Sequence, residues 1–236
     1  MNFTPFTTLT FDCYGTLIDW ESGILTALRP LLSRAGARPD TAVLRDFADH
    51  ESRQQAATPD MLYADLLTAV HGQLARHWGV TADAAEDRRF GASIGDWPPF
   101  SDTVAALTYL KENFRLVILS NVDRVSFAAT NARLGIAFDA IHTAQDIGSY
   151  KPDTRNFEYL RERLAEQGVG QNQILHVAQS LFHDHAPANA VGLHSVWIDR
   201  RAGSGGWGAT ATPPDGVRYD ARFLSLAALV QAHRDG

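Results

Sequence analysis

Four short polar blocks each follow an apolar run that is typical of a buried β-strand. They lie at residues 11–17, 119–121, 149–153 and 176–185. Ligands of parallel sheets bind outside the carboxyl ends of the strands, so we expect these blocks to meet at one site. An aspartate that ends a buried strand is desolvated and needs a partner. Lys151 is the natural partner of Asp12, and its charge would keep Asp12 ionised and nucleophilic.

The second block would supply Ser120 and Asn121 as hydroxyl and amide donors for a substrate or an intermediate. Each block also has a purely structural interpretation. Asp12 could cap a turn, and residues 120–121 could form a strand-to-helix loop. Residues 151–153 could serve only as the start of a helix. Four polar blocks at four successive strand ends nevertheless favour a site over coincidence.

The order of the elements predicts an α/β fold. Apolar runs typical of strands alternate with helical patterns, which indicates a parallel sheet with right-handed crossovers; the runs are residues 8–11, 116–119, 140–143, 174–177 and 195–198. Residues 12–115 separate the first two runs, whereas a crossover needs only about a dozen residues. We therefore expect a helical insert over residues 18–96 and a core of residues 1–17 and 97–236. Residues 201–217, rich in Gly and Pro, predict a surface loop before a last helix.

Bulk composition excludes several classes of protein. The 236 residues carry a net charge of −6 without a basic run, which argues against a nucleic-acid partner. No apolar stretch approaches the ~20 residues that span a bilayer, so we expect no membrane partner. The single cysteine, Cys13, cannot form a disulfide within the chain, and the N-terminus does not resemble a signal peptide. The expectation is a soluble, cytoplasmic protein.

The motifs together resemble the haloacid dehalogenase superfamily, and within it the L-2-haloacid dehalogenase (type II) branch. The resemblance rests on Asp-Cys-Tyr-Gly-Thr-Leu at 12–17, Leu-Ser-Asn at 119–121 and Tyr-Lys-Pro-Asp at 150–153. It covers nearly the whole chain and implies a Rossmann-like parallel sheet core with an inserted helical cap domain. Residues 11–20 and 180–185 look most similar to the L-azetidine-2-carboxylate hydrolase type.

The resemblance implies that Asp12 attacks carbon and forms an ester, which water then hydrolyses at the Asp12 carbonyl. Lys151 would pair with Asp12, while Ser120, Asn121 and Thr16 would orient Asp12 and the substrate carboxylate. The catalytic candidates are Asp12, Lys151, Ser120, Asn121 and Asp184, and the substrate-binding candidates are Tyr14, Thr16, Trp20, Ser180 and His183.

The chain departs from the phosphatases of the superfamily. They place a second Asp two residues after the nucleophile as a general acid, and Tyr14 cannot do that work. They also hold Mg²⁺ with an acidic pair in the fourth block, where this chain has Gln179 and an Asp184 offset by one residue. We therefore predict no cofactor and no essential metal. Asp184 would hold Lys151 or a water, or it would only be a helix N-terminal charge.

The chain also departs from a plain dehalogenase. The branch has an Arg on the first long cap helix, for which Arg45 and Arg53 are equal candidates here. Where the branch has a Tyr after the Lys, this chain has Phe157. Where the branch has a Ser and an Asn in the fourth block, this chain has Ala178 and Ser180. These changes weigh against halide chemistry but leave the Asp12 nucleophile untouched.

The His183-Asp184-His185 cluster could supply acid–base groups. A leaving ring nitrogen must accept a proton and a halide need not, so the cluster mildly favours an amine substrate. Alternatively, both histidines satisfy backbone groups at a helix start. His176, on a predicted buried strand, is expected to be a satisfied core histidine.

The first functional hypothesis is hydrolytic dehalogenation of a short 2-haloacid, and the runner-up is ring opening of L-azetidine-2-carboxylate. The chain lacks the acidic residues that a Mg²⁺-dependent phosphatase needs. A non-catalytic binding module would not need both Asp12 and Lys151 intact. The expected partner is a small carboxylate substrate, and the chain is expected to be a monomer or a homodimer.

Overall fold

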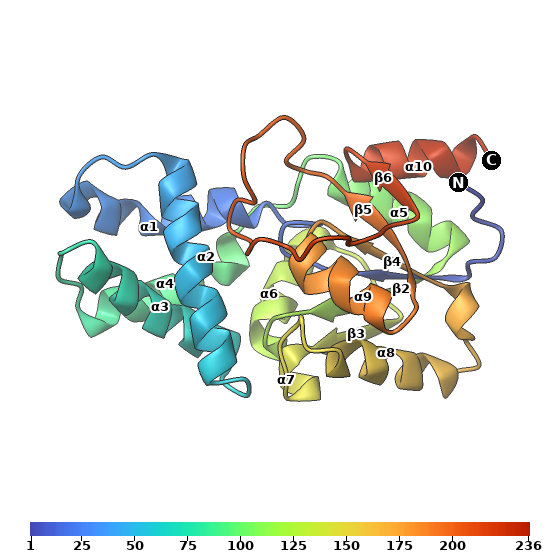
Figure 1. Cartoon of the computed structure of the whole chain (residues 1–236), viewed down its shortest axis with the longest axis horizontal. Coiled ribbons are helices and arrows are strands. Elements are labelled where there is room, and N and C mark those ends of the chain that lie inside the picture. The colour runs from blue at the N-terminus through green and yellow to red at the C-terminus, as the bar shows by residue number, and fades with distance from the viewer.

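The computed structural model describes residues 1–236 and consists of a sheet flanked by helices, with a second group of helices beside it (Figure 1). Six parallel strands form one sheet in the order β3-β2-β1-β4-β5-β6. The strands are β1 (Thr8–Phe11), β2 (Arg115–Ser120), β3 (Ala140–Thr143), β4 (Ile174–Ala178), β5 (His194–Ile198) and β6 (Ala221–Phe223). The α/β fold with a Rossmann-like parallel sheet is confirmed, and the first five strands match the predicted runs.

Burial on both faces explains why these segments form strands. Along β2, Leu116 and Ile118 pack into a large cluster that includes α5 (Thr103–Asn113) and α10 (Leu226–Arg234). Val117 and Leu119 point to the opposite face, where a second cluster includes α8 (Arg155–Ala165) and part of α9 (Ala186–Ala190). Because successive side chains of a strand alternate between faces, a sheet covered by helices on both sides reads as a continuous apolar run.

The strand order places a switch point beside β1. From β1 the chain crosses to β2 and β3 on one side, and it then returns to β4 on the other side of β1. Ligands of doubly wound sheets bind at such a point, outside the carboxyl ends of the strands. The polar blocks that follow β1, β2 and β4 therefore converge there. The connection from β2 to β3 contains α6 (Arg124–Leu134), and α7 (Ala144–Ile147) follows β3.

The helices between β1 and α5 lie to the left of the sheet in Figure 1. They are α1 (Trp20–Ala35), α2 (Asp40–Ala57), α3 (Tyr63–His77) and α4 (Ala84–Ala92), followed by a 3₁₀ turn at Ser93–Asp96. Asp19 caps α1 by accepting from the backbone N–H of Ser22. The apolar faces of these helices join the same hydrophobic cluster that covers one face of the sheet. Helical structure therefore fills the predicted insert, while its exact boundaries stay a prediction.

The segment between β5 and β6 is a long loop that reaches toward α1 and α2 (Figure 1). It is tied to the start of α1 because Glu21 accepts from Arg201 and from the backbone N–H of Ala209 at 2.9 Å. This agrees with the predicted loop at residues 201–217.

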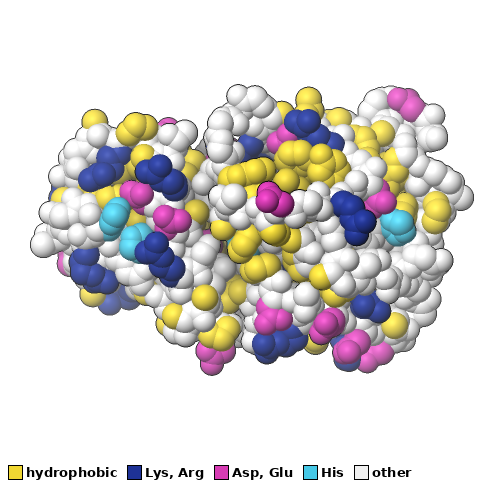
Figure 2. Space-filling model, viewed as in Figure 1, with side chains coloured by type: hydrophobic (Ala, Val, Ile, Leu, Met, Phe, Trp, Pro, Cys, Tyr) yellow, Lys and Arg dark blue, Asp and Glu magenta, His cyan; other side chains and the backbone are white.

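On the face drawn in Figure 2, basic side chains are interspersed with acidic ones. None of the helices has both the length and the apolar character needed to cross a membrane.

Candidate active site

A small pocket lies where the sheet meets the second group of helices. Its free volume is about 30 Å³, room for one or two waters. The residues that line it are Asp12, Tyr14, Trp20, Glu51, Gln55, Tyr63, Asn121, Lys151, Ser180, His183, Asp184 and Thr210. Eight of the ten predicted site residues are therefore brought together here. Thr16 and Ser120 do not line the pocket, although Thr16 donates a hydrogen bond to Asp12.

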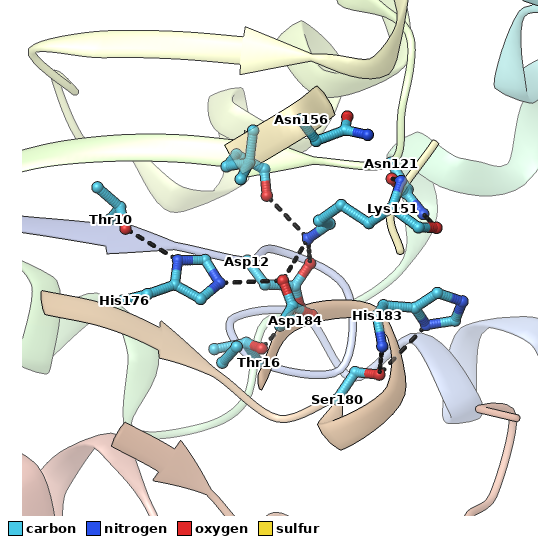
Figure 3. A network of polar contacts seen from close by, with 12 residues as sticks. Thr10, Asp12, Thr16, Asn121, Lys151, Asn156, His176, Ser180, His183 and Asp184 are labelled. Atoms are coloured by element: carbon cyan, nitrogen blue, oxygen red, sulfur yellow. Dashed lines mark hydrogen bonds and ion pairs between the residues drawn. The ribbon is translucent and has the colours of Figure 1, made fainter. Parts of the chain in front are cut away.

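Lys151 contacts two carboxylates, Asp12 and Asp184, that line the pocket with it (Figure 3). Its ammonium nitrogen donates to Asp12 Oδ1 at 2.9 Å and to Asp184 Oδ1 at 2.7 Å. A third hydrogen bond, at 3.0 Å, runs to the carbonyl oxygen of Leu119. Because an ammonium group has three hydrogens, these contacts satisfy Lys151 completely. The Lys151 side chain is only 1 % exposed, so the ion pairs are almost unscreened by water.

Burial and the neighbouring charges set the ionisation of this group of residues. Burial alone would lower the pKa of Lys151, but Asp12 and Asp184 outweigh it and raise that pKa above its usual value. Burial opposes ionisation of Asp184 too, yet Lys151 and His176 hold its pKa well below the usual range. Burial raises the pKa of Asp12, and Lys151 opposes this rise. Both oxygens of Asp12 accept hydrogen bonds, which is the environment of an ionised carboxylate.

Thr16 fixes the second oxygen of Asp12. Its hydroxyl donates to Asp12 Oδ2 at 2.7 Å and accepts from the backbone N–H of Gln179 at 2.9 Å. The turn after β1 needs Gly15, whose φ of 90° is unfavourable for other residues. Thr16 thus joins the end of β1 to the end of β4. Of the three residues predicted to orient Asp12, it is the one that contacts the carboxylate.

Asn121 and Ser120 behave differently from what their sequence block suggests. The Asn121 side chain accepts from the backbone N–H of Lys151 at 2.7 Å and donates to the Lys151 carbonyl at 2.9 Å. It therefore holds the backbone of Lys151 in place, while its amide also lines the pocket. The Ser120 hydroxyl is buried, forms no hydrogen bond and does not line the pocket. No hydrogen bond joins the Ser120 hydroxyl to Asp12.

The fourth block forms a π-helical turn at Leu181–His185. Ser180 caps this turn by accepting from the backbone N–H of His183 at 2.9 Å. Its hydroxyl also lies 3.2 Å from His183 Nδ1 (Figure 3). The other ring nitrogen, Nε2, is buried without a partner in the wall of the pocket. Burial lowers the pKa of His183 to about 4, so this side chain is neutral near pH 7.

The two other histidines of this region have mainly structural contacts. His185 lies 2.9 Å from Ser195 Oγ and 3.0 Å from the Ala178 carbonyl, so it satisfies polar groups away from the pocket. His176 lies 2.8 Å from Thr10 Oγ1 and 3.0 Å from Asp184 Oδ1. His176 is a satisfied core histidine, as predicted, and it also positions Asp184.

Four lining residues were absent from the predicted site: Glu51, Gln55, Tyr63 and Thr210. A signal for the first two exists in the sequence, because the buried face of α2 consists of Val43, Leu44, Phe47, Ala48, Glu51 and Gln55. Polar residues that continue an apolar helical period are buried, and a buried Glu needs a reason. Neither candidate arginine lines the pocket, and Arg45 instead borders a separate groove with the loop after β5. Lys151 is the one Lys or Arg among the lining residues.

Comparison with known proteins decides the family. The model of a family described as haloacid dehalogenase-like hydrolase matches residues 6–184. The chain belongs to this family. It is 28% identical to an (S)-2-haloacid dehalogenase of Pseudomonas fluorescens, with 82% of this chain and 85% of that protein covered. A second (S)-2-haloacid dehalogenase, from Pseudomonas putida, is 25% identical over 83% of this chain and 86% of its own.

Solved structures of haloacid dehalogenases share the fold of this family member. The L-2-haloacid dehalogenase of Xanthobacter autotrophicus with chloropropionic acid covalently bound matches with a TM-score of 0.78 and 18% identity. The match covers 97% of this chain and 98% of that one. The predicted membership of the haloacid dehalogenase superfamily is confirmed, and the chain is a hydrolase by family.

The oxygen atoms around the pocket of this haloacid dehalogenase-like hydrolase do not fit a magnesium ion, which needs an octahedral shell of oxygen ligands. Asp12 and Asp184 share the ammonium of Lys151, and the Tyr14 hydroxyl lies 2.9 Å from Thr130 Oγ1. Gln179 contributes a backbone N–H, which is a donor. No group of three or more His, Cys, Asp and Glu side chains is arranged to hold a metal ion.

Proposed function

We propose that this hydrolase cleaves a small 2-substituted carboxylic acid through an Asp12 ester, with the halide of a short 2-haloacid as the first candidate leaving group. The observation that carries the proposal is the setting of Asp12: a buried carboxylate that lines a small pocket and is held by hydrogen bonds from Lys151 and Thr16. Relatives named (S)-2-haloacid dehalogenase, aligned over more than four fifths of the chain, supply the candidate substrate.

The proposed reaction has two steps. An oxygen of Asp12 attacks C2 of the substrate, and the bond from C2 to the leaving group breaks with its electron pair on that group. Water then adds to the Asp12 carbonyl carbon, which releases the 2-hydroxy acid and regenerates the carboxylate. Lys151 would stabilise the oxyanion that forms on Asp12 in the second step. Asp184 Oδ2 and His183 Nε2, on residues that line the pocket, are buried without a partner, and we assign them to the hydrolytic water and the substrate.

A second candidate is the hydrolytic opening of L-azetidine-2-carboxylate, in which the leaving group is the ring nitrogen. One observation favours it: Lys151 is the only Lys or Arg that lines the pocket, and all its hydrogens are engaged. A departing halide would therefore meet no free cation. A ring nitrogen does not need one.

The test is turnover, in the presence of a chelator, on a matched panel. The panel contains L-2-chloropropionate, chloroacetate, fluoroacetate and L-azetidine-2-carboxylate, with 4-nitrophenyl phosphate as the control. Halide release supports the first candidate, and consumption of azetidine-2-carboxylate without halide supports the second. Phosphate release that requires Mg²⁺, with no turnover of the carboxylates, would overturn both.

We further propose that residues 18–96 act as a cap over a core of residues 1–17 and 97–236. Support comes from the pocket, whose free volume of about 30 Å³ is too small for the substrate, so some opening is required. The backbone N–H of Ala64 donates to Asp123 across the two parts at 3.2 Å. Oxidising the cysteine pair Ala64→Cys and Asp123→Cys should slow turnover, and a reductant should restore it. Unchanged turnover in the oxidised pair would contradict cap motion.

We also propose a cytoplasmic location and a monomeric or homodimeric state. The location is supported by a single cysteine, Cys13, which is buried and unpaired. Sedimentation equilibrium separates the two states. Fractionation of the native cells checks the location.

A further inference from the structure

Glu51 is a buried acid that the proposed reaction does not use. It lies on the inner face of α2, is only 2 % exposed, and lines the same pocket as Asp12. Its Oε1 accepts a hydrogen bond from the Tyr63 hydroxyl at 2.6 Å. Its Oε2 is buried and has no hydrogen-bond partner. One oxygen of this buried carboxyl group therefore has no hydrogen-bond partner in the protein.

No cation of the protein compensates Glu51. Lys151 is the only Lys or Arg among the lining residues, and Asp12, Asp184 and Leu119 already accept its three hydrogens. Burial consequently raises the pKa of Glu51 to about 7, although the Tyr63 hydrogen bond lowers it. An unpaired buried carboxylate is expensive, because it loses hydration without gaining a countercharge.

The charges around the pocket favour one kind of ligand. With Lys151 as the only cation, ionised Asp12 and Asp184 leave this buried site with a net negative charge. Ionised Glu51 makes the site more negative still. A plain 2-haloacid carries only its own negative carboxylate and would add to the repulsion. A zwitterion with a carboxylate and a protonated amine brings the missing positive charge.

We propose that Glu51 determines specificity by binding a protonated amine of the substrate through Oε2, so that the pocket prefers small amino carboxylates to plain 2-haloacids. This rests on the proposed function and chooses its second candidate. When Asp12 attacks C2 of a cyclic ammonium substrate, the C2–N bond breaks and its electron pair stays on nitrogen. The nitrogen leaves as a neutral amine, and it takes up the proton released when water hydrolyses the ester.

Binding of two unreactive ligands tests the proposal without any turnover. L-Proline carries the amine, and (S)-tetrahydrofuran-2-carboxylate has the same ring with oxygen in place of that amine. By calorimetry, wild-type protein should prefer L-proline by about tenfold or more, the value of a hydrogen bond to a charged group. Glu51→Gln keeps an acceptor for Tyr63 and should abolish the preference. Asp49→Asn, an exposed acid on the same helix, should keep it. Equal affinities in the wild type, or a preference that survives Glu51→Gln, would overturn the proposal.

Turnover supplies a second, separate readout. Glu51→Gln should lower kcat/KM for L-azetidine-2-carboxylate by about tenfold or more, without a matching loss for L-2-chloropropionate. An equal loss for both substrates would mean that Glu51 acts only through structure, and the proposal would fail. If wild-type protein turns over neither substrate but binds L-proline through Glu51, the proposed function fails and this inference stands. If the protein turns over haloacids but shows no preference for the amine, this inference fails and the proposed function stands.

Discussion

The ammonium nitrogen of Lys151 lies 2.7 Å from Oδ1 of Asp184, and both side chains are almost completely buried. This ion pair lies directly behind Asp12, so one lysine supports the nucleophile while a second carboxylate anchors the lysine. A lone buried Lys–Asp12 pair would leave hydrogens of the ammonium unsatisfied. Asp184 and the Leu119 carbonyl supply the remaining acceptors. The pairing of Asp12 with Lys151 therefore depends on the fourth block as well as the third.

Replacing Lys151 with Met should abolish turnover and reduce the free energy of unfolding by about 3–5 kcal/mol. The reason is that two carboxylates, Asp12 and Asp184, would remain buried without their shared cation. Urea denaturation at pH 7 measures the stability, and the substrate panel measures activity. Adding Asp184→Asn to the Lys151→Met variant removes one of the two charges and should recover part of the stability, but no activity. A Lys151→Met variant as stable as the wild type would contradict this account of the ion pairs.

Asp12→Asn should eliminate turnover while the protein stays folded, because Lys151 keeps its hydrogen bonds to Asp184 and Leu119. In a single turnover of excess wild-type enzyme in ¹⁸O-labelled water, hydrolysis of the ester should place label in the Asp12 carboxylate. Mass spectrometry of the peptide that contains Asp12 detects it. Label found only in the product would show that water attacks the substrate directly.

The sequence predicted the arrangement of the core well, because a parallel sheet buried on both faces leaves a strong apolar signal. It missed β6, whose three residues are exposed or half-buried and lie at the edge of the sheet. The contact of Asp12 with Lys151 followed from chemistry, since a buried aspartate needs a cation. The two hydrogen bonds between the Asn121 side chain and the Lys151 backbone left no such signal in the sequence.

The residues that α2 and α3 contribute to the pocket were harder to predict. Glu51 and Gln55 approach Asp12 only because α2 packs over the carboxyl end of the sheet, and no local pattern reports that placement. The family resemblance directed attention to an arginine on the first long cap helix. In the structure Arg45 is exposed and faces a different groove. The apolar period of α2, which Glu51 continues, was the better signal, although Glu51 was not among the predicted site residues.

Thr16→Val should lower kcat by about tenfold to a hundredfold. The variant removes the hydrogen bond to Asp12 Oδ2 and leaves the backbone N–H of Gln179 without an acceptor, a change that typically costs about 1–3 kcal/mol. Steady-state kinetics and thermal unfolding report the two effects. Thr16→Ser keeps the hydroxyl and should stay near the wild type in both. If Thr16→Ser loses as much activity as Thr16→Val, packing of the methyl group explains the effect instead.

Glu51→Gln should stabilise the protein in alkaline solution. The folded pKa of Glu51 is raised to about 7 from a usual 4.5, so the folded state holds its proton more tightly than the unfolded chain. Stability linked to this group is complete below pH 4.5 and is lost as the pH rises through 7. The group faces Tyr63 directly, and the charged Asp12, Asp184 and Lys151 line the same pocket. Unfolding free energies at pH 5 and pH 8 should differ less in the variant than in wild type. Asp49→Asn should behave like the wild type, and equal slopes in all three proteins would be a contradiction.

His185→Asn should reduce the loss of unfolding free energy as the pH falls from 7 to 4, without changing activity at pH 7. Burial lowers the pKa of His185 to about 4 from 6.5, so the unfolded chain binds its proton first as the pH falls. Stability linked to His185 is complete above pH 6.5 and is lost as the pH falls through 4, by up to about 3 kcal/mol. His183 titrates in the same direction, so the variant should remove only part of the slope between pH 7 and pH 4. Because its contacts are with Ser195 and Ala178, away from the pocket, kcat at pH 7 should stay near the wild-type value. Denaturation series at four pH values measure the slope. A variant that loses activity while its slope stays unchanged would place His185 in the reaction and not in the core.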